Sequence, residues 1–386
     1  MFTRTLSRAL PKSSFFLFGP RQVGKTTLLE GVPDAIRIDL LDPDEQLAFN
    51  KSPNLLRERL SAAPQRRTVV IDEIQRVPRL LDVVQSLFDH DRSLRFIMSG
   101  SSARKLRSGQ ANLLGGRIRT LNLHPLTAAE IGGAFRLDQA LTYGTLPRVA
   151  IELGAGSHEE ARAILKAYVT MYLREEIKAE ALVRSLHGFQ NFLDVAAAQF
   201  AEQVNFSAVS RECQVAYATV REFYSILEDT LVGFFLKPHA RSERKRMSLA
   251  PKFYFFDNGV TRAALHALPA APNPAERGRL FEQWFIQEVN RLNDYGDKDW
   301  MLSFWRTSHG AEVDLLIERA GRIIAAFESK STPNISAADL SGLKAFSETH
   351  ANVPLFVAAP VKAPRKIGDV TILDPLEALA MLEKRF

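Results

Sequence analysis

The chain lacks the features that mark secreted and membrane proteins. Its 386 residues include one cysteine, Cys213, so no disulfide can form within the chain. This usage is typical of a reducing compartment, and we expect a cytoplasmic protein. No apolar run approaches the roughly 20 residues that a spanning helix needs, and the N-terminal apolar stretch is too short for a signal peptide. We therefore expect no membrane partner.

Charge and composition give little information about the class of protein. Lys and Arg number 50 against 44 Asp and Glu, which gives a net charge of +6 and a pI near 9.4. A basic chain is compatible with a polyanionic partner such as nucleic acid, but so small an excess spread over this length is weak support. The length predicts two or three domains.

Hydrophobic periodicity changes twice along the chain. Short apolar strands at 15–18, 35–39, 68–72 and 94–99 alternate with helical stretches, which predicts an α/β fold with a mostly parallel sheet. Residues 157–250 are mainly helical by spacing. After a linker rich in alanine and proline, a helix, three strands, a helix and a strand follow. The predicted domains are residues 1–155, 156–268 and 269–386.

A phosphate-binding loop follows the first strand. Residues 19–26 fit G-x-x-x-x-G-K-[ST] between the strand FFLF and a helix, which is the context that this motif requires. Lys25 would neutralise charge on the β- and γ-phosphates of ATP, and the Thr26 hydroxyl would join a Mg²⁺ shell. The residues expected to contact nucleotide here are Gly19, Pro20, Arg21, Gln22, Val23, Gly24, Lys25, Thr26 and Thr27.

Two later strand ends complete the predicted ATPase site. The apolar strand ending in Asp72 and Glu73 supplies a magnesium ligand through water and a general base for the attacking water. At the next strand end either Ser99 or Ser101 could sense the γ-phosphate, and the sequence does not choose between them. A basic run follows, in which Arg117 is either an arginine supplied in trans within a homo-oligomer or part of a solvent-exposed loop.

The middle of the chain predicts a helix-turn-helix. Helices at 207–212 and 217–228 are joined by a tight turn, and the second is a candidate for the major groove of DNA. Residues 237–252, between two strand candidates, carry six Lys and Arg against one acid, as in a wing that contacts phosphates. The expected contacts are Arg241, Arg244, Lys245 and Arg246. Alternatively, this module packs against the ATPase domain or another subunit.

The last segment carries a candidate metal site. Asp314 and Glu328 would hold Mg²⁺ or Mn²⁺, Lys330 would orient or activate a water, and Glu282 on the long helix would complete the set. Glu328 and Lys330 share a strand face, and a hairpin turning near residue 320 predicts that Asp314 lies opposite residue 326. The alternative is that Asp314 forms a plain salt bridge with Arg306.

Taken together, these motifs resemble a family of bacterial and archaeal AAA+ ATPases fused to a nuclease-like module. The matching segments are GPRQVGKTT, VVIDEIQRVP, FIMSGSS, LLGGR, LHPLTAAE, YGTLPRV, PKFYFFDNGV and GRLFEQWFIQEV. The resemblance implies an AAA+ core, a helical and winged-helix middle, and a C-terminal restriction-endonuclease-like domain. Residues Glu282, Asp314, Glu328 and Lys330 match the site of the PD-(D/E)XK nuclease core, with Val313 in place of its proline.

The sequence thus predicts an ATPase that acts on nucleic acid, DNA in the first place, with ATP gating a metal-dependent nuclease. The alternative is an ATP-controlled switch that binds DNA or a protein and carries an inactive nuclease fold.

Overall fold

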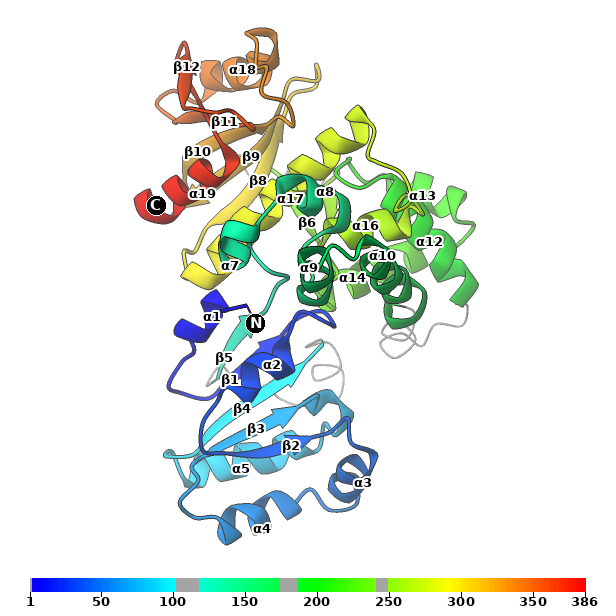
Figure 1. Cartoon of the computed structure of the whole chain (residues 1–386), viewed down its shortest axis with the longest axis vertical. Helices are drawn as coiled ribbons and strands as arrows, with labels where there is room; N and C mark the ends of the chain where they lie inside the picture. Colours follow the sequence, from blue (N-terminus) through cyan, green and yellow to red (C-terminus); the bar gives the residue numbers. More distant parts are fainter. Residues whose placement is uncertain (1, 102–117, 174–185, 241–248) are drawn as a thin grey trace.

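The computed structural model describes residues 2–101, 118–173, 186–240 and 249–386. In Figure 1 a sheet built from the N-terminal part of the chain lies at one end, a second sheet at the other, and a cluster of helices beside them. Among the described residues, no helix combines the length and apolar character needed to cross a bilayer.

The N-terminal sheet has five parallel strands in the order β2-β3-β4-β1-β5. The strands are β1 (Phe15–Phe18), β2 (Ala35–Asp39), β3 (Thr68–Asp72), β4 (Arg95–Gly100) and β5 (Arg119–Asn122). Its helices are α1 (Thr5–Arg8), α2 (Lys25–Glu30), α3 (Pro43–Lys51), α4 (Leu55–Ala62) and α5 (Leu80–His90). The predicted parallel sheet and its first four strands are confirmed.

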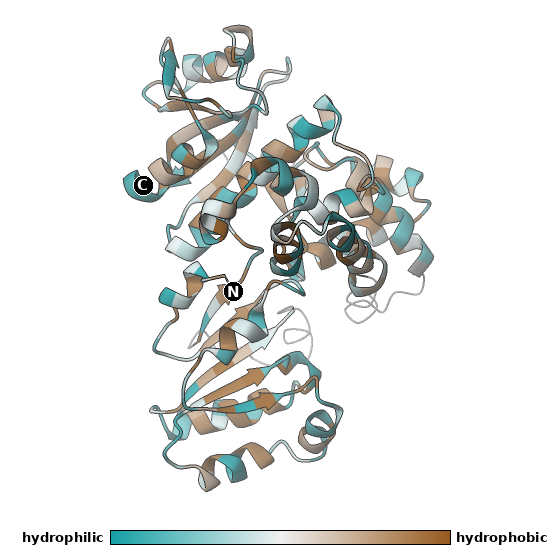
Figure 2. Ribbon diagram, viewed as in Figure 1, coloured by the Kyte–Doolittle hydropathy of each residue, from teal (hydrophilic) through white to brown (hydrophobic). Residues whose placement is uncertain are grey.

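The three central strands, β1, β3 and β4, are mostly continuous apolar runs because both faces of the sheet are covered there, whereas the edge strands β2 and β5 carry exposed polar residues. Phe15 and Leu17 of β1 join one hydrophobic cluster, whereas Phe16 and Phe18 join another. Successive side chains of a strand point to opposite faces, so four apolar residues in a row stabilise both layers. In Figure 2 the strands of this sheet are largely brown, whereas the helices beside it show both teal and brown residues. Parallel strands place their carboxyl ends at one edge, where the site is built.

The middle segment is helical. Its elements are α7 (Ala128–Ile131), α8 (Leu137–Tyr143), α9 (Pro147–Gly154), α10 (His158–Ala167), the π-helix η4 (Tyr168–Leu173), α12 (Leu186–Ala198), α13 (Phe206–Glu212), α14 (Tyr217–Asp229) and α16 (Asn258–Ala264). Helices α13 and α14 occupy the two predicted positions of the helix-turn-helix. Much of α14 is buried through Val220, Phe223 and Leu227, so one face of this helix packs on the core.

The second sheet has eight strands in the order β12-β13-β11-β10-β9-β8-β6-β7. The strands are β6 (Gly233–Pro238), β7 (Lys252–Phe255), β8 (Met301–Arg306), β9 (Glu312–Arg319), β10 (Arg322–Ser329), β11 (Leu355–Ala358), β12 (Arg365–Ile367) and β13 (Val370–Leu373). The helices are α17 (Pro274–Gly296), α18 (Ser341–Thr349) and α19 (Pro375–Arg385). The predicted order of helix, three strands, helix and strand is confirmed by α17, β8, β9, β10, α18 and β11.

This sheet joins the middle segment to the C-terminal one. Lys237 of β6 pairs with Ser303 of β8 in parallel, so the β6–β7 hairpin extends the C-terminal sheet. One hydrophobic cluster likewise runs from Leu6 to Leu382. The hairpin that the sequence predicts as a wing is therefore attached to the carboxylate-bearing strands.

The predicted register of the β9–β10 hairpin is wrong. Ala320 and Gly321 have φ values of 50° and 75° and form a two-residue turn, and the register shifts again between Ile323 and Ala325. Ala326 therefore pairs with Leu316. The same register, continued along both strands, sets Asp314 opposite Glu328. The two carboxylates are cross-strand neighbours, closer than the predicted diagonal.

Candidate functional site

The phosphate loop closes around its own lysine. Gly24, just before α2, has φ 93°, a conformation that requires glycine. Lys25 is buried, and its Nζ donates to the carbonyls of Gly19 at 2.7 Å and Pro20 at 3.0 Å. These contacts hold the ammonium group inside the loop, where phosphate oxygens of a nucleotide could replace the two carbonyls.

Asp72 lies between two hydroxyl groups from neighbouring elements. Thr26 Oγ1 donates to Asp72 Oδ2 at 2.7 Å, and the Ser99 hydroxyl donates to Asp72 Oδ1. The backbone N–H of Glu73 donates to Ser99 Oγ at 3.3 Å. The structure thus brings together Thr26, Asp72 and Ser99, the oxygen-rich set that Mg²⁺ prefers, so these residues fit that ion.

Glu73 is held by a glutamine that the sequence analysis missed. Gln75 Nε2 donates to the Glu73 carboxylate and lies 3.4 Å from Ser101 Oγ. Its Oε1 is buried without a hydrogen-bond partner, and a Cβ at Gly100 would lie 2.5 Å from that oxygen. Gly100 therefore leaves space for Gln75. The two serines contact different carboxylates: Ser99 contacts Asp72, and Ser101 approaches the glutamine that orients Glu73.

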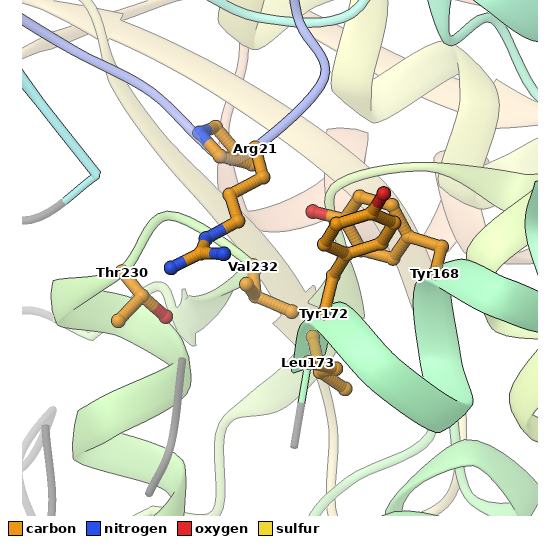
Figure 3. Close-up of a pocket in the computed structure, with 7 residues that line it drawn as sticks. Arg21, Tyr168, Tyr172, Leu173, Thr230 and Val232 are labelled. Carbon is orange, nitrogen blue, oxygen red and sulfur yellow. The ribbon is translucent and has the colours of Figure 1, made fainter. Parts of the chain in front are cut away.

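A small cavity is lined by Pro20 and Arg21 of the phosphate loop together with residues of the helical segment. Figure 3 shows Arg21 extending toward Thr230 and Val232, with the rings of Tyr168 and Tyr172 beside it. The cavity measures about 10 Å³, which is room for about one water and too little for a nucleobase. Arg21 therefore connects the phosphate loop to the helical segment in this conformation.

Arg4, also missed in the sequence, connects the phosphate loop to α17. Its Nη1 donates to the Val23 carbonyl at 2.6 Å, and its Nη2 donates to the His124 carbonyl at 2.6 Å. Its Nε lies 3.2 Å from Glu130 Oε2, and that carboxylate side chain is 1% exposed. Nη2 also donates to the Tyr295 hydroxyl at 3.2 Å. An arginine that precedes the first strand thus reaches the loop, α7 and α17 together.

In the second sheet, Asp314 and Glu328 lie at the centre of a carboxylate cluster. Asp314 Oδ2 accepts from Ser329 N at 2.8 Å and from Ser329 Oγ at 2.6 Å. Glu328 Oε1 accepts from Lys330 Nζ at 2.8 Å, whereas Glu328 Oε2 is buried without a hydrogen-bond partner. Burial, and then the nearby Asp314 carboxylate, raise the pKa of Glu328 to about 8.

Glu282 on α17 joins the same cluster. Burial raises its pKa to about 7, and the charge of Asp314 adds to this rise. Glu282 Oε1 accepts from Lys252 Nζ at 2.8 Å and from the Tyr254 hydroxyl at 2.6 Å. Lys252 also pairs with Glu312 Oε1 at 2.5 Å. The structure therefore brings all four predicted residues together and adds three residues that the sequence analysis did not assign to this site.

One alternative and one expectation from the sequence are wrong here. Arg306 pairs with Glu312 at 3.1 Å, so it is not the salt-bridge partner of Asp314. Lys252, counted in the sequence among the basic residues of the wing, is buried among carboxylates and not available to a phosphate backbone. The sequence carries a signal for this burial, since a lysine at the start of an apolar strand is unusual.

The cluster fits a divalent cation. Within the ranges that the structure describes, no three His, Cys, Asp or Glu side chains are grouped so that they could hold a metal ion together, so a cation here would have two protein ligands, Asp314 and Glu328. Mg²⁺ commonly uses one or two carboxylates and completes its shell with water. The buried, unpartnered Glu328 Oε2 beside Asp314 is the kind of oxygen such an ion would satisfy.

The nucleic-acid contacts predicted from the sequence, Arg241, Arg244, Lys245 and Arg246, lie outside the described residues. So does Arg117, the arginine predicted to act in trans on ATP. A groove of 1110 Å³ runs along α13, α14 and β6 and includes Arg221 and Lys237. The exposed face of α14 carries Arg221 against Glu222 and Glu228, which does not favour insertion into a phosphate-lined groove.

Three other segments of the resemblance, LHPLTAAE, YGTLPRV and PKFYFFDNGV, meet in a set of buried polar contacts around Asp257 and Arg291, which we call the polar hub. Thr145 N donates to Asp257 Oδ2 at 2.7 Å, and a Cβ at Gly144 would lie 1.9 Å from Asp257 Oδ1. Arg291 of α17 donates to the Leu126 carbonyl at 3.0 Å and pairs with Glu288 at 2.8 Å. These contacts fix the middle segment and the segment after β5 on α17, so their role is structural.

Comparison with known families divides the chain in three. Residues 12–132 match a family described as an AAA domain, residues 134–270 match a domain of unknown function (DUF8612), and residues 277–379 match another (DUF4143). The five-stranded parallel sheet with its phosphate loop is therefore an AAA-type ATPase domain at the N-terminus of the chain. Neither of the other two descriptions names an activity.

Whole proteins similar to this chain occur in several bacteria. The uncharacterized protein Rv2008c of Mycobacterium tuberculosis is 29% identical over 347 residues, which cover 88% of this chain and 75% of that protein. The corresponding Mycobacterium bovis protein, Mb2031c, gives the same values. An uncharacterized protein of Haemophilus influenzae is 22% identical over 230 residues, covering 55% of this chain and 56% of that protein.

Solved structures of a replication initiator are more distant. DnaA bound to AMPPCP and single-stranded DNA aligns with a TM-score of 0.31 and 14% identity, covering 58% of this chain and 85% of that one. AMPPCP-bound DnaA from Aquifex aeolicus aligns with a TM-score of 0.30 and 13% identity, covering 58% and 84%. Scores this low add nothing to the assignment, which depends on the phosphate loop and the family match.

Proposed function

We propose that this protein hydrolyses ATP and acts on nucleic acid, and that ATP gates metal-dependent phosphodiester cleavage at the C-terminal cluster. The observation that carries the cleavage proposal is the meeting of Asp314 and Glu328, with an unpartnered buried oxygen, beside Glu282 and Lys330. Carboxylates that hold a divalent cation, together with a lysine, are the groups that phosphodiester hydrolysis needs.

At the nucleotide site, each residue has a part in phosphoryl transfer. Lys25 would exchange its loop carbonyls for the β- and γ-phosphates, and Thr26 and Asp72 would hold Mg²⁺, which neutralises phosphate charge when bound. Glu73, oriented by Gln75, would position the attacking water. Ser99 already contacts Asp72 and would respond to the γ-phosphate.

At the cleavage site, Asp314 and Glu328 would hold Mg²⁺ or Mn²⁺, which polarises the scissile phosphate when bound. Lys330 Nζ, 2.8 Å from Glu328, would orient the attacking water. Glu282 would accept its proton, since its pKa of about 7 lies near neutral pH. The Arg4 contacts to the phosphate loop and α17 offer a route by which nucleotide affects the helix that carries Glu282.

The proposal also covers the domain bounds, the fold of the C-terminal domain, the DNA contacts, the oligomer and the location of the protein. The three domains are residues 1–155, 156–268 and 269–386, and the last has a restriction-endonuclease-like, PD-(D/E)XK fold. The basic residues at 241 and 244–246 would contact the phosphates of DNA. Arg117 would act in trans on a neighbouring subunit of a homo-oligomer, and the protein would work in the cytoplasm.

One observation favours a second function, an ATP-controlled switch with a silent nuclease fold. Lys252 already pairs with Glu282 and Glu312, so two carboxylates of the cluster share a cation that belongs to the protein itself. In that case the protein would bind DNA or a protein partner without cutting.

Cleavage of circular single- and double-stranded DNA separates the two functions. The assay uses Mg²⁺ or Mn²⁺ with and without ATP, and compares wild type with Asp314→Asn, Lys330→Ala and the exposed control Asp369→Asn. Cutting that requires metal and disappears in the first two variants only would establish the nuclease. ATP hydrolysis without cutting of DNA or RNA would favour the switch.

The ATP site needs its own test. Lys25→Ala should lose nucleotide binding, whereas the exposed Lys51→Ala should retain it. Unchanged ATP affinity in Lys25→Ala, measured by isothermal titration calorimetry, would overturn the phosphate-loop assignment.

A further inference from the structure

Lys252 is a buried cation inside the carboxylate cluster. It begins β7 in the middle segment, is 4% exposed, and pairs with Glu282 at 2.8 Å and Glu312 at 2.5 Å. Its Nζ also lies 5.5 Å from the centre of the Phe304 ring. A lysine is almost never buried this deeply unless it is paired, and here two carboxylates on different elements, α17 and β9, share the ammonium group.

The carboxylate oxygens of the cluster differ in how many hydrogen bonds they accept. Glu282 Oε1 already accepts two hydrogen bonds, from Lys252 and from Tyr254. In contrast, Glu328 Oε2 is buried and accepts none, and Asp314 is bonded only by the neighbouring Ser329 in the described contacts. Glu282 and Glu312 therefore share one protein cation, Lys252. Glu328 is paired with Lys330 through Oε1 only, and its buried Oε2 beside Asp314 has no partner, so it is the oxygen that an added cation would satisfy.

Phosphodiester cleavage by paired metals uses two divalent ions about 3.5–4 Å apart, one near the attacking and one near the leaving oxygen. We propose that Lys252 takes the place of one of these ions. The site then binds a single divalent cation, at Asp314 and Glu328, and Lys252 supplies the second positive charge by holding Glu282 and Glu312. This inference rests on the cleavage function proposed above and specifies its metal requirement.

Metal stoichiometry tests this assignment directly. Mn²⁺ binding to the full-length protein is counted by electron paramagnetic resonance without nucleotide, in an Asp72→Asn background that removes the metal ligand of the ATPase site. We expect one Mn²⁺ per chain in this background. Lys252→Met should raise the number to two, because it frees Glu282 and Glu312, and Lys252→Arg should leave it at one because it keeps the charge.

The controls separate failure of this inference from failure of the proposed function. If Asp314→Asn leaves Mn²⁺ binding unchanged, or no Mn²⁺ binds at all, the metal site of the proposed function is wrong and the inference falls with it. If Asp314→Asn removes the one ion but Lys252→Met, folded by circular dichroism, still binds only one, the role of Lys252 alone is refuted. If Lys252→Met does not fold, the test uses the Asp72→Asn protein with Lys252 intact. Two Mn²⁺ ions bound to that protein refute the role of Lys252, whereas one ion in that protein and one in its Lys252→Arg variant support it.

Discussion

Tyr295 accepts a hydrogen bond at 3.2 Å from Arg4, a residue 291 positions earlier in the chain. The same guanidinium group donates to the Val23 carbonyl inside the phosphate loop. One side chain therefore contacts both the nucleotide site and the C-terminal end of α17, the helix that carries Glu282. Arg4 thus joins the phosphate loop to the helix that carries Glu282.

Removing the Arg4 charge should affect stability and nucleotide binding together. Arg4→Met leaves the buried Glu130 carboxylate without its cation, which costs about 3 kcal/mol in the free energy of unfolding. It also frees the Val23 carbonyl, so ATP affinity should fall. Urea denaturation and calorimetric ATP titration measure the two effects.

Tyr295→Phe is the matched, milder change. It removes one hydroxyl and should cost about 1 kcal/mol, while ATP hydrolysis stays near the wild-type rate. If Arg4 links the two sites, this variant should reduce the effect of ATP on cleavage. An unchanged ATP effect in Tyr295→Phe would exclude this hydrogen bond as the link.

Replacing Glu73 by glutamine should separate ATP binding from hydrolysis. The amide cannot accept a proton from water, so hydrolysis should fall by about 100-fold or more while ATP still binds. Phosphate release and nucleotide retention on a filter measure the two quantities. The exposed Glu58→Gln serves as the control. Wild-type hydrolysis in Glu73→Gln would assign the general base elsewhere.

The sequence predicts the ATPase sheet well because its signals are local. Strands β1, β3 and β4 are apolar runs bounded by polar or glycine residues, and the site residues follow directly at their ends. The motif spacing also predicts that Thr26 and Asp72 meet, since both lie at the carboxyl edge of one parallel sheet.

The remainder depends on contacts that no local pattern encodes. Arg4 finds partners more than 100 positions away, and Lys252 belongs to the middle segment in sequence but to the carboxylate cluster in space. The error in the β9–β10 register has a different cause: it arises from the two left-handed residues at the turn and from an irregularity after Ile323. A turn or bulge that changes the strand register by one residue changes which side chains lie opposite each other.

A pair of glycines tests the polar hub. Gly144 has φ 70°, and its Cβ would meet Asp257, so Gly144→Ala combines backbone strain with overpacking and should destabilise the fold by about 3 kcal/mol. Gly154 closes α9 with nothing within 4 Å of its Cβ, so Gly154→Ala should be neutral or slightly stabilising. Thermal denaturation compares the two. Equal melting temperatures would show that the hub tolerates a displaced Asp257.

The carboxylate cluster predicts a stability that falls with rising pH. The pKa of Glu328 is about 8 in the folded chain against an ordinary 4.5, so the folded state keeps a proton that the unfolded state releases. The free energy of unfolding therefore decreases between about pH 4.5 and pH 8, by about 1.4 kcal/mol for each pH unit and group. Glu282, with a pKa of about 7, contributes in the same direction.

Glu328→Gln replaces the ionisable group by a neutral one and should remove most of this dependence. We expect it to be more stable than wild type by about 4 kcal/mol at pH 8.5 and nearly equal at pH 5, whereas the exposed Glu348→Gln should follow wild type. Mn²⁺ should restore wild-type stability at pH 8.5, because the ion favours the ionised carboxylate that burial opposes. The stabilisation by Mn²⁺ at pH 8.5 should be smaller in Glu328→Gln than in wild type. If Mn²⁺ stabilises both proteins equally at pH 8.5, the ion is bound elsewhere and Glu328 is not its ligand.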